Sequence, residues 1–257
     1  MAVAPVDVLF LNGWSFTSGF AQPYIQRIAG NRTVHIEDTS YEHGSIGGLE
    51  HLLPYLHPGT LIVGWSLGGM LAIRLARIAE TRGVAFSSLV CLMTTPVFVE
   101  SESMSQGMSR KTFAQFEAMA KRSDDLVKQF PFLITQGASD QRTLLKEVRA
   151  AYETHVQSVV HRVRALALLS NLDVCEELEG INTQALLVFG EQDALIAKDY
   201  VSQLRSRWAS KENLELALLS GVGHFPFVAV VVELLRARLV CSRGCERNTT
   251  IRDAGVK

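Results

Sequence analysis

The sequence is poor in cysteine and proline, has no long apolar run and has almost no net charge. Four cysteines and seven prolines in 257 residues are too few for a disulfide scaffold or a proline-rich chain. No apolar run approaches the roughly eighteen residues of a membrane span. The formal net charge of -1 favours neither nucleic acid nor an anionic membrane as a partner. What remains is a globular chain whose 47% hydrophobic content predicts a sizeable core.

The start of the chain also lacks the basic stretch of a secretory signal. Its first apolar run ends in Asn12-Gly13-Trp14, which is typical of a strand and its turn, so we expect a cytoplasmic protein. Cys91 and Cys175 lie in or near predicted core elements and are expected to be reduced and structural. Cys241 and Cys245 have no matching Cys or His pair, so no metal site is expected.

Strand-like and helix-like patterns alternate along the chain, which indicates an α/β fold with a mostly parallel, doubly wound sheet. Strands are predicted at 6–11, 33–37, 61–65, 88–93, 185–189 and 214–219. Helices are predicted at 20–29, 48–55, 67–80, 198–208 and 227–239. The strand pattern stops from residue 97 to about 180, where helices are predicted at 111–121, 124–130, 141–160 and 163–169.

This order predicts an α/β core interrupted by one helical insertion. Residues 1–96 form the first part of the core, 97–180 a helical cap, 181–240 the second part and 241–257 a polar tail. The segment 97–165 is mildly basic, with ten Lys or Arg residues against eight Asp or Glu residues.

The strongest chemical signal lies where the strand 61–65 ends. It runs into Gly64-Trp65-Ser66-Leu67-Gly68, a Gly-x-Ser-x-Gly pattern, and helical spacing follows at once. A serine at a sharp strand-to-helix turn has its hydroxyl lifted clear of the sheet, and the glycines permit strained dihedrals. Ser66 is therefore the predicted nucleophile. The alternative is an ordinary glycine-rich turn.

An acid and a base are predicted after two later strands, because catalytic groups gather at the carboxyl ends of strands in such sheets. Asp193 follows the strand 185–189, and His224 lies in a glycine-rich turn after 214–219. His224 would take the serine proton while Asp193 holds the imidazole. The alternatives are a turn or cap role for Asp193, Glu191 as the acid, and a turn role for His224. Six other histidines are interpreted as structural or solvated: His35, His43, His51, His57, His155 and His161.

Acyl transfer also needs hydrogen-bond donors for the oxyanion. The backbone N–H of Leu67, at the start of the helix, is one candidate. The other is the backbone N–H of Trp14, in the turn after the first strand. The Trp14 ring could equally be a hydrophobic plug over the sheet, and the two roles are compatible.

With these residues, the chain resembles the α/β-hydrolase superfamily over nearly its whole length. Within it, the closest match is to the carboxylesterases of biotin biosynthesis that hydrolyse pimeloyl-acyl-carrier-protein methyl ester. The matching motifs are Gly64 to Gly69 (Gly-Trp-Ser-Leu-Gly-Gly), Gly13-Trp14, Thr94 to Phe98, Gly190 to Asp193, and His224 to Phe227.

The resemblance implies a triad of Ser66, Asp193 and His224, and an oxyanion hole of Trp14 and Leu67. Trp14, Trp65 and Phe130 would line the acyl pocket. No metal or organic cofactor is implied. Three departures stand out: Asn12 replaces the usual His, the loop 38–44 lacks the common Gly-x-Gly-x-Ser form, and the chain starts at the core strand. We therefore expect a sheet that is reduced at the N-terminus.

The implied partner is an acidic acyl-carrier protein, which would favour a basic rim on the cap. The candidate docking residues are Lys121, Arg122, Lys128, Arg142, Lys146 and Arg149, and solvated helix faces are the alternative. We expect a monomer. Competing functions are a generalist short-chain esterase, a C–C or lactone hydrolase, and a non-catalytic ligand receptor, since pocket shape rather than fold sets the substrate.

Overall fold

The computed structural model describes residues 3–45, 47–102, 104–121 and 123–241. In these residues six parallel strands form one sheet in the order β2-β1-β3-β4-β5-β6. The strands are β1 (Val8–Leu11), β2 (Val34–Glu37), β3 (Leu61–Trp65), β4 (Ser88–Leu92), β5 (Ala185–Gly190) and β6 (Leu214–Leu219). The strand order reverses between β1 and β3, which is where doubly wound sheets bind ligands. The predicted fold class is confirmed.

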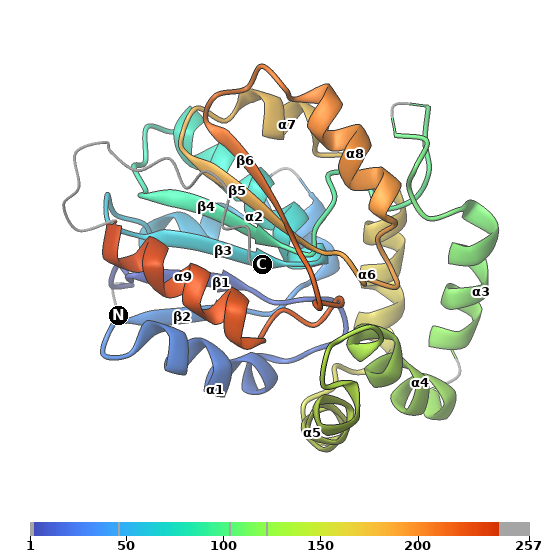
Figure 1. The fold of residues 1–257 in the computed structure, drawn as a ribbon. Helices are drawn as coiled ribbons and strands as arrows, with labels where there is room; N and C mark the ends of the chain where they lie inside the picture. Colours follow the sequence, from blue (N-terminus) through green and yellow to red (C-terminus); the bar gives the residue numbers. More distant parts are fainter. Residues whose placement is uncertain (1–2, 46, 103, 122, 242–257) are drawn as a thin grey trace, which may run out of the picture.

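Helices cover both faces of this sheet (Figure 1). On the near face in this view, α1 (Ser18–Ala29) packs on α9 (Ala229–Cys241). On the far face, α2 (Leu67–Thr81) packs on α7 (Cys175–Gly180). Two 3-10 helices, η1 (Tyr41–Gly44) and η2 (Glu50–Tyr55), follow β2, and α8 (Lys198–Arg207) follows β5.

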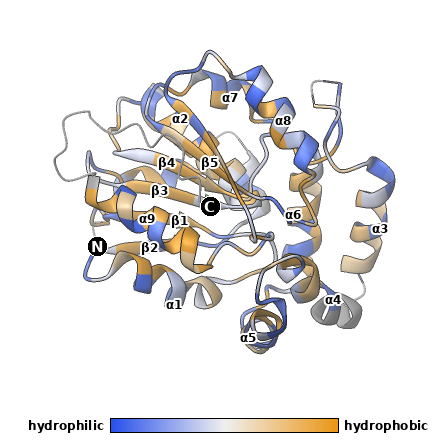
Figure 2. Cartoon of the chain, viewed as in Figure 1, coloured by the Kyte–Doolittle hydropathy of each residue, from blue (hydrophilic) through white to orange (hydrophobic). Residues whose placement is uncertain are grey.

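The central strands are apolar because both of their faces are covered. Every residue of β1, β3 and β5 is buried. Figure 2 shows this as hydrophobic colouring along the strands, whereas the outer faces of helices such as α8 are hydrophilic. None of the helices in the described ranges has the length and apolar character to cross a membrane.

Of the five helices that the structure describes between β4 and β5, the first four lie beyond the carboxyl ends of the strands (Figure 1). We call them the cap helices: α3 (Arg110–Ala120), α4 (Ser123–Thr135), α5 (Gln141–Thr154) and α6 (Val159–Asn171). They lie at the edge of the sheet at which β1 and β3 end, and so on the same side as the turns that follow these strands.

The prediction of one continuous helix over residues 141–160 is wrong. Residues 155–158 separate α5 from α6, and Phe16 and Val156 form an antiparallel bridge there. The Thr17 N–H donates to the His155 carbonyl and the Gln157 N–H to the Ser15 carbonyl, both at 2.9 Å. The turn after β1 therefore satisfies these backbone groups in place of helical hydrogen bonds.

Candidate active site

Ser66 occupies a strained turn between β3 and α2. Its dihedral angles are φ 53° and ψ -123°, a region that residues with a side chain rarely adopt. The Ser66 N–H donates to the Leu92 carbonyl at 2.9 Å, and the Thr94 hydroxyl lies 3.0 Å from the Ser66 carbonyl oxygen. Strain of this kind amounts to roughly 1–3 kcal/mol and persists only where neighbours hold it in place. Both neighbours come from β4 and the residues just after it.

The glycines around Ser66 are explained by close approach of main chains. A Cβ atom on Gly68 would lie 2.2 Å from the carbonyl oxygens of Leu11 and Asn12. A Cβ atom on Gly64 would lie 2.4 Å from the Gly68 carbonyl oxygen. The end of β1 and the start of α2 are thus in direct backbone contact. This contact places the turn after β1 beside Ser66.

The structure brings the three predicted triad residues into one hydrogen-bonded chain. His224 Nε2 lies 3.1 Å from Ser66 Oγ, and His224 Nδ1 lies 2.8 Å from Asp193 Oδ2. The side chains of His224 and Asp193 are 2% and 1% exposed. An ionised carboxylate only accepts hydrogen bonds, so Nδ1 carries the proton and Nε2 accepts from the serine hydroxyl. This arrangement can activate the hydroxyl as a nucleophile.

Asp193 is fixed by a second set of hydrogen bonds. Its Oδ1 atom accepts from the backbone N–H groups of Leu195 at 2.8 Å and Ile196 at 3.1 Å. Glu191, the alternative acid, instead forms an ion pair with Lys198 at 2.5 Å. Asp193 is therefore the carboxylate that faces His224.

The loops that carry Asp193 and His224 are joined to each other. The Gln192 N–H donates to the Val222 carbonyl at 3.0 Å, and the Gln192 side-chain oxygen accepts from the Gly221 N–H at 2.6 Å. The loop of His224 is also bound to the cap, because the Phe225 N–H donates to the Ile134 carbonyl of α4 at 2.8 Å. The turn that carries the base is thus tied both to the acid loop and to α4.

Trp65 supports His224 from inside the core. Its indole N–H donates to the His224 carbonyl at 3.0 Å, and the ring is 1% exposed. The ring packs against Phe16, Phe225 and Phe227, with centroid distances of 4.9, 6.2 and 5.8 Å. These contacts are those of a buried support for the base, whereas a wall of the acyl pocket needs side chains that face the ester.

 The expected place of Trp65 in the acyl pocket therefore stays a prediction.

The two predicted oxyanion donors are both unpaired. Neither the Leu67 N–H nor the Trp14 N–H donates to another residue in the described part of the chain. The turn that presents Trp14 is held by its neighbours: the Gly13 N–H donates to Asn12 Oδ1 at 3.0 Å, and the Thr39 hydroxyl lies 3.4 Å from the Gly13 carbonyl oxygen. Asn12, which replaces the usual His, thus braces the turn through its own side chain.

The Trp14 side chain reaches into the cap helices. Its indole N–H donates to the Arg162 carbonyl at 2.8 Å, and the ring is 3% exposed. Phe116 of α3 and Phe130 of α4 meet it edge to face, with centroids 5.1 and 4.9 Å away. The ring is thus a plug between core and cap, while its backbone N–H remains available as a donor.

Sequence reasoning missed a polar group beside this plug. The Ser15 and Tyr152 hydroxyls lie 2.5 Å apart, and the Arg162 guanidinium lies near the Tyr152 hydroxyl. Arg162 is 2% exposed, yet its Nε and Nη1 atoms have no partner among the described residues. Only the unusual position of an arginine between apolar residues of α6 could have drawn attention to it.

We expect Arg162→Met to raise the free energy of unfolding by about 1–3 kcal/mol, because it removes a buried cation with unpaired donors. At this chain length that corresponds to a rise in Tm of about 2–4 °C per kcal/mol. Arg164→Met is the control, because the Arg164 side chain is 60% exposed and only 3.7 Å from Glu42 in a surface pair. A lower Tm for Arg162→Met than for wild type would contradict the expectation.

The predicted docking residues lie on two cap helices where the structure describes them. Lys121 is the C-cap residue that follows α3, and it pairs with Glu117 at 3.7 Å. Arg142, Lys146 and Arg149 are exposed on successive turns of α5. Arg122, the side chain of Lys128 and the tail 242–257 lie outside what the structure describes.

Two other kinds of reactive group occur in the described residues. Burial raises the pKa of the Cys91 thiol, and burial together with Asp173 raises that of Cys175 to about 12, so neither thiol is an activated nucleophile. Glu37, His43 and His51 form a group that could hold a metal ion. None of these three belongs to the triad.

Comparisons with known proteins agree with this fold. A model described as the alpha/beta hydrolase family matches residues 8–236. A protein from Nitrosospira multiformis, named pimeloyl-[acyl-carrier protein] methyl ester esterase, is 27% identical over 240 residues, 87% of this chain and 89% of that protein. One of the same name from Xylella fastidiosa is 24% identical over 233 residues, 86% of this chain and 89% of that protein.

Solved structures show the same fold. An esterase from Exiguobacterium antarcticum has a TM-score of 0.71 at 15% identity, covering 95% of this chain and 93% of that chain. A hydrolase from Oleispira antarctica also has a TM-score of 0.71, at 16% identity, covering 90% of each chain. The family match spans the sheet, the cap helices and the strained turn at Ser66. The chain belongs to the alpha/beta hydrolase family.

Proposed function

We propose that this protein is a serine carboxylesterase that hydrolyses the methyl ester of pimeloyl-acyl-carrier protein, releasing methanol and the free acid, in biotin biosynthesis. The observation that carries the esterase proposal is the hydrogen-bonded chain from Asp193 through His224 to Ser66. The names of the relatives from two organisms support the substrate.

In the proposed mechanism, Ser66 Oγ attacks the ester carbonyl while His224 Nε2 takes its proton. Asp193 stabilises the imidazolium that forms. The imidazolium then protonates the departing methoxide, and methanol leaves the acyl-enzyme. Water activated by the same His224 nitrogen releases the acid and restores the serine.

The unpaired backbone donors complete this proposal. The Leu67 and Trp14 N–H groups would receive the negative charge that develops on the carbonyl oxygen. The Trp14 and Phe130 rings, which meet at 4.9 Å between core and cap, would contact the acyl chain. An apolar wall of this kind suits the methylene chain of a dicarboxylate half-ester.

The direct test is turnover of purified pimeloyl-acyl-carrier-protein methyl ester, followed by the appearance of the free acid. We expect Ser66-dependent hydrolysis, and complementation of a biotin-auxotrophic strain that lacks this esterase. Hydrolysis of short p-nitrophenyl esters without turnover of the carrier-protein ester would instead indicate a generalist esterase. No Ser66-dependent hydrolysis of either substrate would contradict the enzymatic proposal as a whole.

We expect simultaneous reversal of Arg142, Lys146 and Arg149 to Glu to lower kcat/KM for the carrier-protein ester at least about tenfold. The three side chains are exposed on successive turns of α5, where they would attract an acidic carrier protein. The loss should shrink as salt is added, because exposed charges are screened.

Turnover of a small p-nitrophenyl ester by the same variant should be unchanged, since no carrier protein is involved. Reversal of three bases on core helices, Arg27, Arg77 and Arg236, is the control for net charge. Equal losses in the two triple variants would argue against docking on α5.

A further inference from the structure

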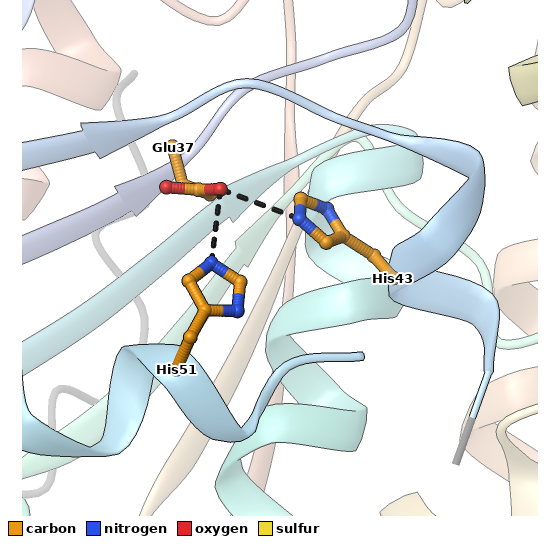
Figure 3. A group of neighbouring side chains, drawn as sticks. All are labelled: Glu37, His43 and His51. Carbon is orange, nitrogen blue, oxygen red and sulfur yellow. Dashed lines mark hydrogen bonds and ion pairs between the residues drawn. The ribbon is translucent and has the colours of Figure 1, made fainter. Parts of the chain in front are cut away.

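A second cluster of chemically active side chains lies just beyond the end of β2 (Figure 3). Glu37 is the last residue of β2, His43 belongs to η1 and His51 to η2. Glu37 Oε1 lies 3.3 Å from His43 Nε2 and 3.2 Å from His51 Nε2. One carboxylate oxygen and two imidazole nitrogens therefore converge from three consecutive elements.

We propose that Glu37, His43 and His51 bind a transition-metal dication of the zinc type, through Glu37 Oε1 and the two Nε2 atoms. Imidazole and carboxylate groups are established ligands of such ions. This site would be separate from the esterase triad, and the proposal does not depend on the function proposed above.

The distances fit a metal better than they fit optimal hydrogen bonds. Zinc lies about 2.0–2.1 Å from nitrogen and oxygen ligands, so two ligands of a tetrahedral ion are about 3.3 Å apart. The 3.2 and 3.3 Å separations from Glu37 Oε1 match that edge. Protein N–H···O bonds are most often about 2.9–3.0 Å long. Two of the three ligand–ligand separations thus fit a tetrahedral ion, and all three ligand atoms lie within 4.8 Å of one another.

The surroundings of His51 suit a ligand. His51 Nδ1 lies 3.1 Å from the Gly48 carbonyl oxygen, to which only an N–H can donate. A neutral His51 would then turn a bare Nε2 lone pair toward the Glu37 carboxylate, which also has no proton. A cation between the two relieves this repulsion, and a hydrogen bond from the other ring nitrogen to a carbonyl is usual for metal-bound histidine.

His43 has to change its proton to join the site. Its Nδ1 accepts from the Ser40 N–H at 3.2 Å, so in the neutral ring Nε2 carries the proton and donates to Glu37. On metal binding the proton moves to Nδ1, and the hydrogen bond from Ser40 is given up. The bond from the ion to Nε2 replaces it. The environment of the Ser40 N–H should therefore change when an ion occupies the site.

The carboxylate is ready to act as an anionic ligand. Glu37 Oε1 faces both His43 and His51, and the Glu37 side chain is 21% exposed. His35 Nε2, 3.0 Å from Glu37 Oε2, fixes the orientation of the carboxylate. The His51 side chain is 51% exposed, so an ion can enter from solvent and retain water at its remaining position.

The test begins with chelator-treated, dialysed full-length protein titrated with Zn²⁺ by calorimetry. We expect one saturable site per chain, a rise in Tm with Zn²⁺, and a visible spectrum typical of tetrahedral coordination when Co²⁺ is used. Glu37→Gln and His51→Ala should each weaken Zn²⁺ binding by roughly 100-fold or more, since loss of an outer partner alone weakens it 10–100-fold. His51 is exposed, so its variant is expected to fold even if Glu37→Gln does not.

Two controls separate this site from other metal-binding groups. His57→Ala removes a histidine outside the cluster, and a Cys241→Ser, Cys245→Ser variant removes the two thiols near the C-terminus. Both should bind Zn²⁺ as the wild type does. The proposal is overturned by absence of saturable binding, by binding that survives His51→Ala unchanged, or by binding that is lost in either control.

Discussion

Ser66→Ala is expected to lower kcat for ester hydrolysis by roughly 10⁴-fold or more. The substitution removes the hydroxyl that lies 3.1 Å from His224 Nε2, and no other described nucleophile takes its place there. A short p-nitrophenyl ester, followed by release of nitrophenol, gives the measurement. Ser206→Ala, in an exposed part of α8, should retain wild-type activity. Because members of a triad act as a unit, adding His224→Ala should cause little further loss.

Changes to the acid extend the same test. Asp193→Asn should lower kcat by about 10⁴-fold, since it disturbs the imidazole tautomer without changing side-chain size. Glu191→Gln should leave kcat nearly unchanged, because Glu191 pairs with Lys198 and not with His224. The opposite ranking would identify Glu191 as the acid, and near-normal activity of Ser66→Ala would require another nucleophile.

Gly68→Ala is expected to lower the free energy of unfolding by more than about 3 kcal/mol, which belongs to the severe end of single substitutions. The added methyl group would lie 2.2 Å from the carbonyl oxygens of Leu11 and Asn12. These are main-chain atoms of β1 and its turn, so relief requires moving α2 away from the sheet. At about 2–4 °C per kcal/mol, thermal melts should show a fall in Tm of roughly 6–12 °C.

Gly59→Ala is the matched control for this substitution. Its nearest obstruction, at 2.9 Å, is the side-chain ring of His57, which can turn aside. We expect its Tm to stay within a few degrees of wild type. A Gly68→Ala protein as stable as Gly59→Ala would show that the start of α2 can move without loss of the sheet.

Much of the core could be predicted because its signals are local. A strand buried on both faces requires a continuous apolar run, and β3 and β5 have one. Ser66 and Asp193 were readable because each follows such a strand, whereas His224 was found from its glycine-rich turn after β6, most of which is only partly buried. The backbone contact at Gly68 explains why the motif itself is so informative: no other residue fits there.

The parts that could not be predicted depend on contacts between distant segments. The break between α5 and α6 arises because Val156 pairs with Phe16, and helical periodicity contains no trace of that pairing. The convergence of His43 and His51 on Glu37 depends on the path of η1 and η2. Trp65 was expected in the acyl pocket from a resemblance, whereas its indole hydrogen bond to His224 becomes visible only in the fold.

The bridge between Phe16 and Val156 limits how the cap helices can move relative to the sheet. Swinging all four cap helices away as one rigid lid would break this bridge and the two hydrogen bonds beside it. It would also separate the Trp14 indole from the Arg162 carbonyl. Displacement of the α5–α6 junction would therefore dismantle the turn next to the nucleophile. Any movement that brings substrate to Ser66 and keeps this turn intact must leave the α5–α6 junction in place.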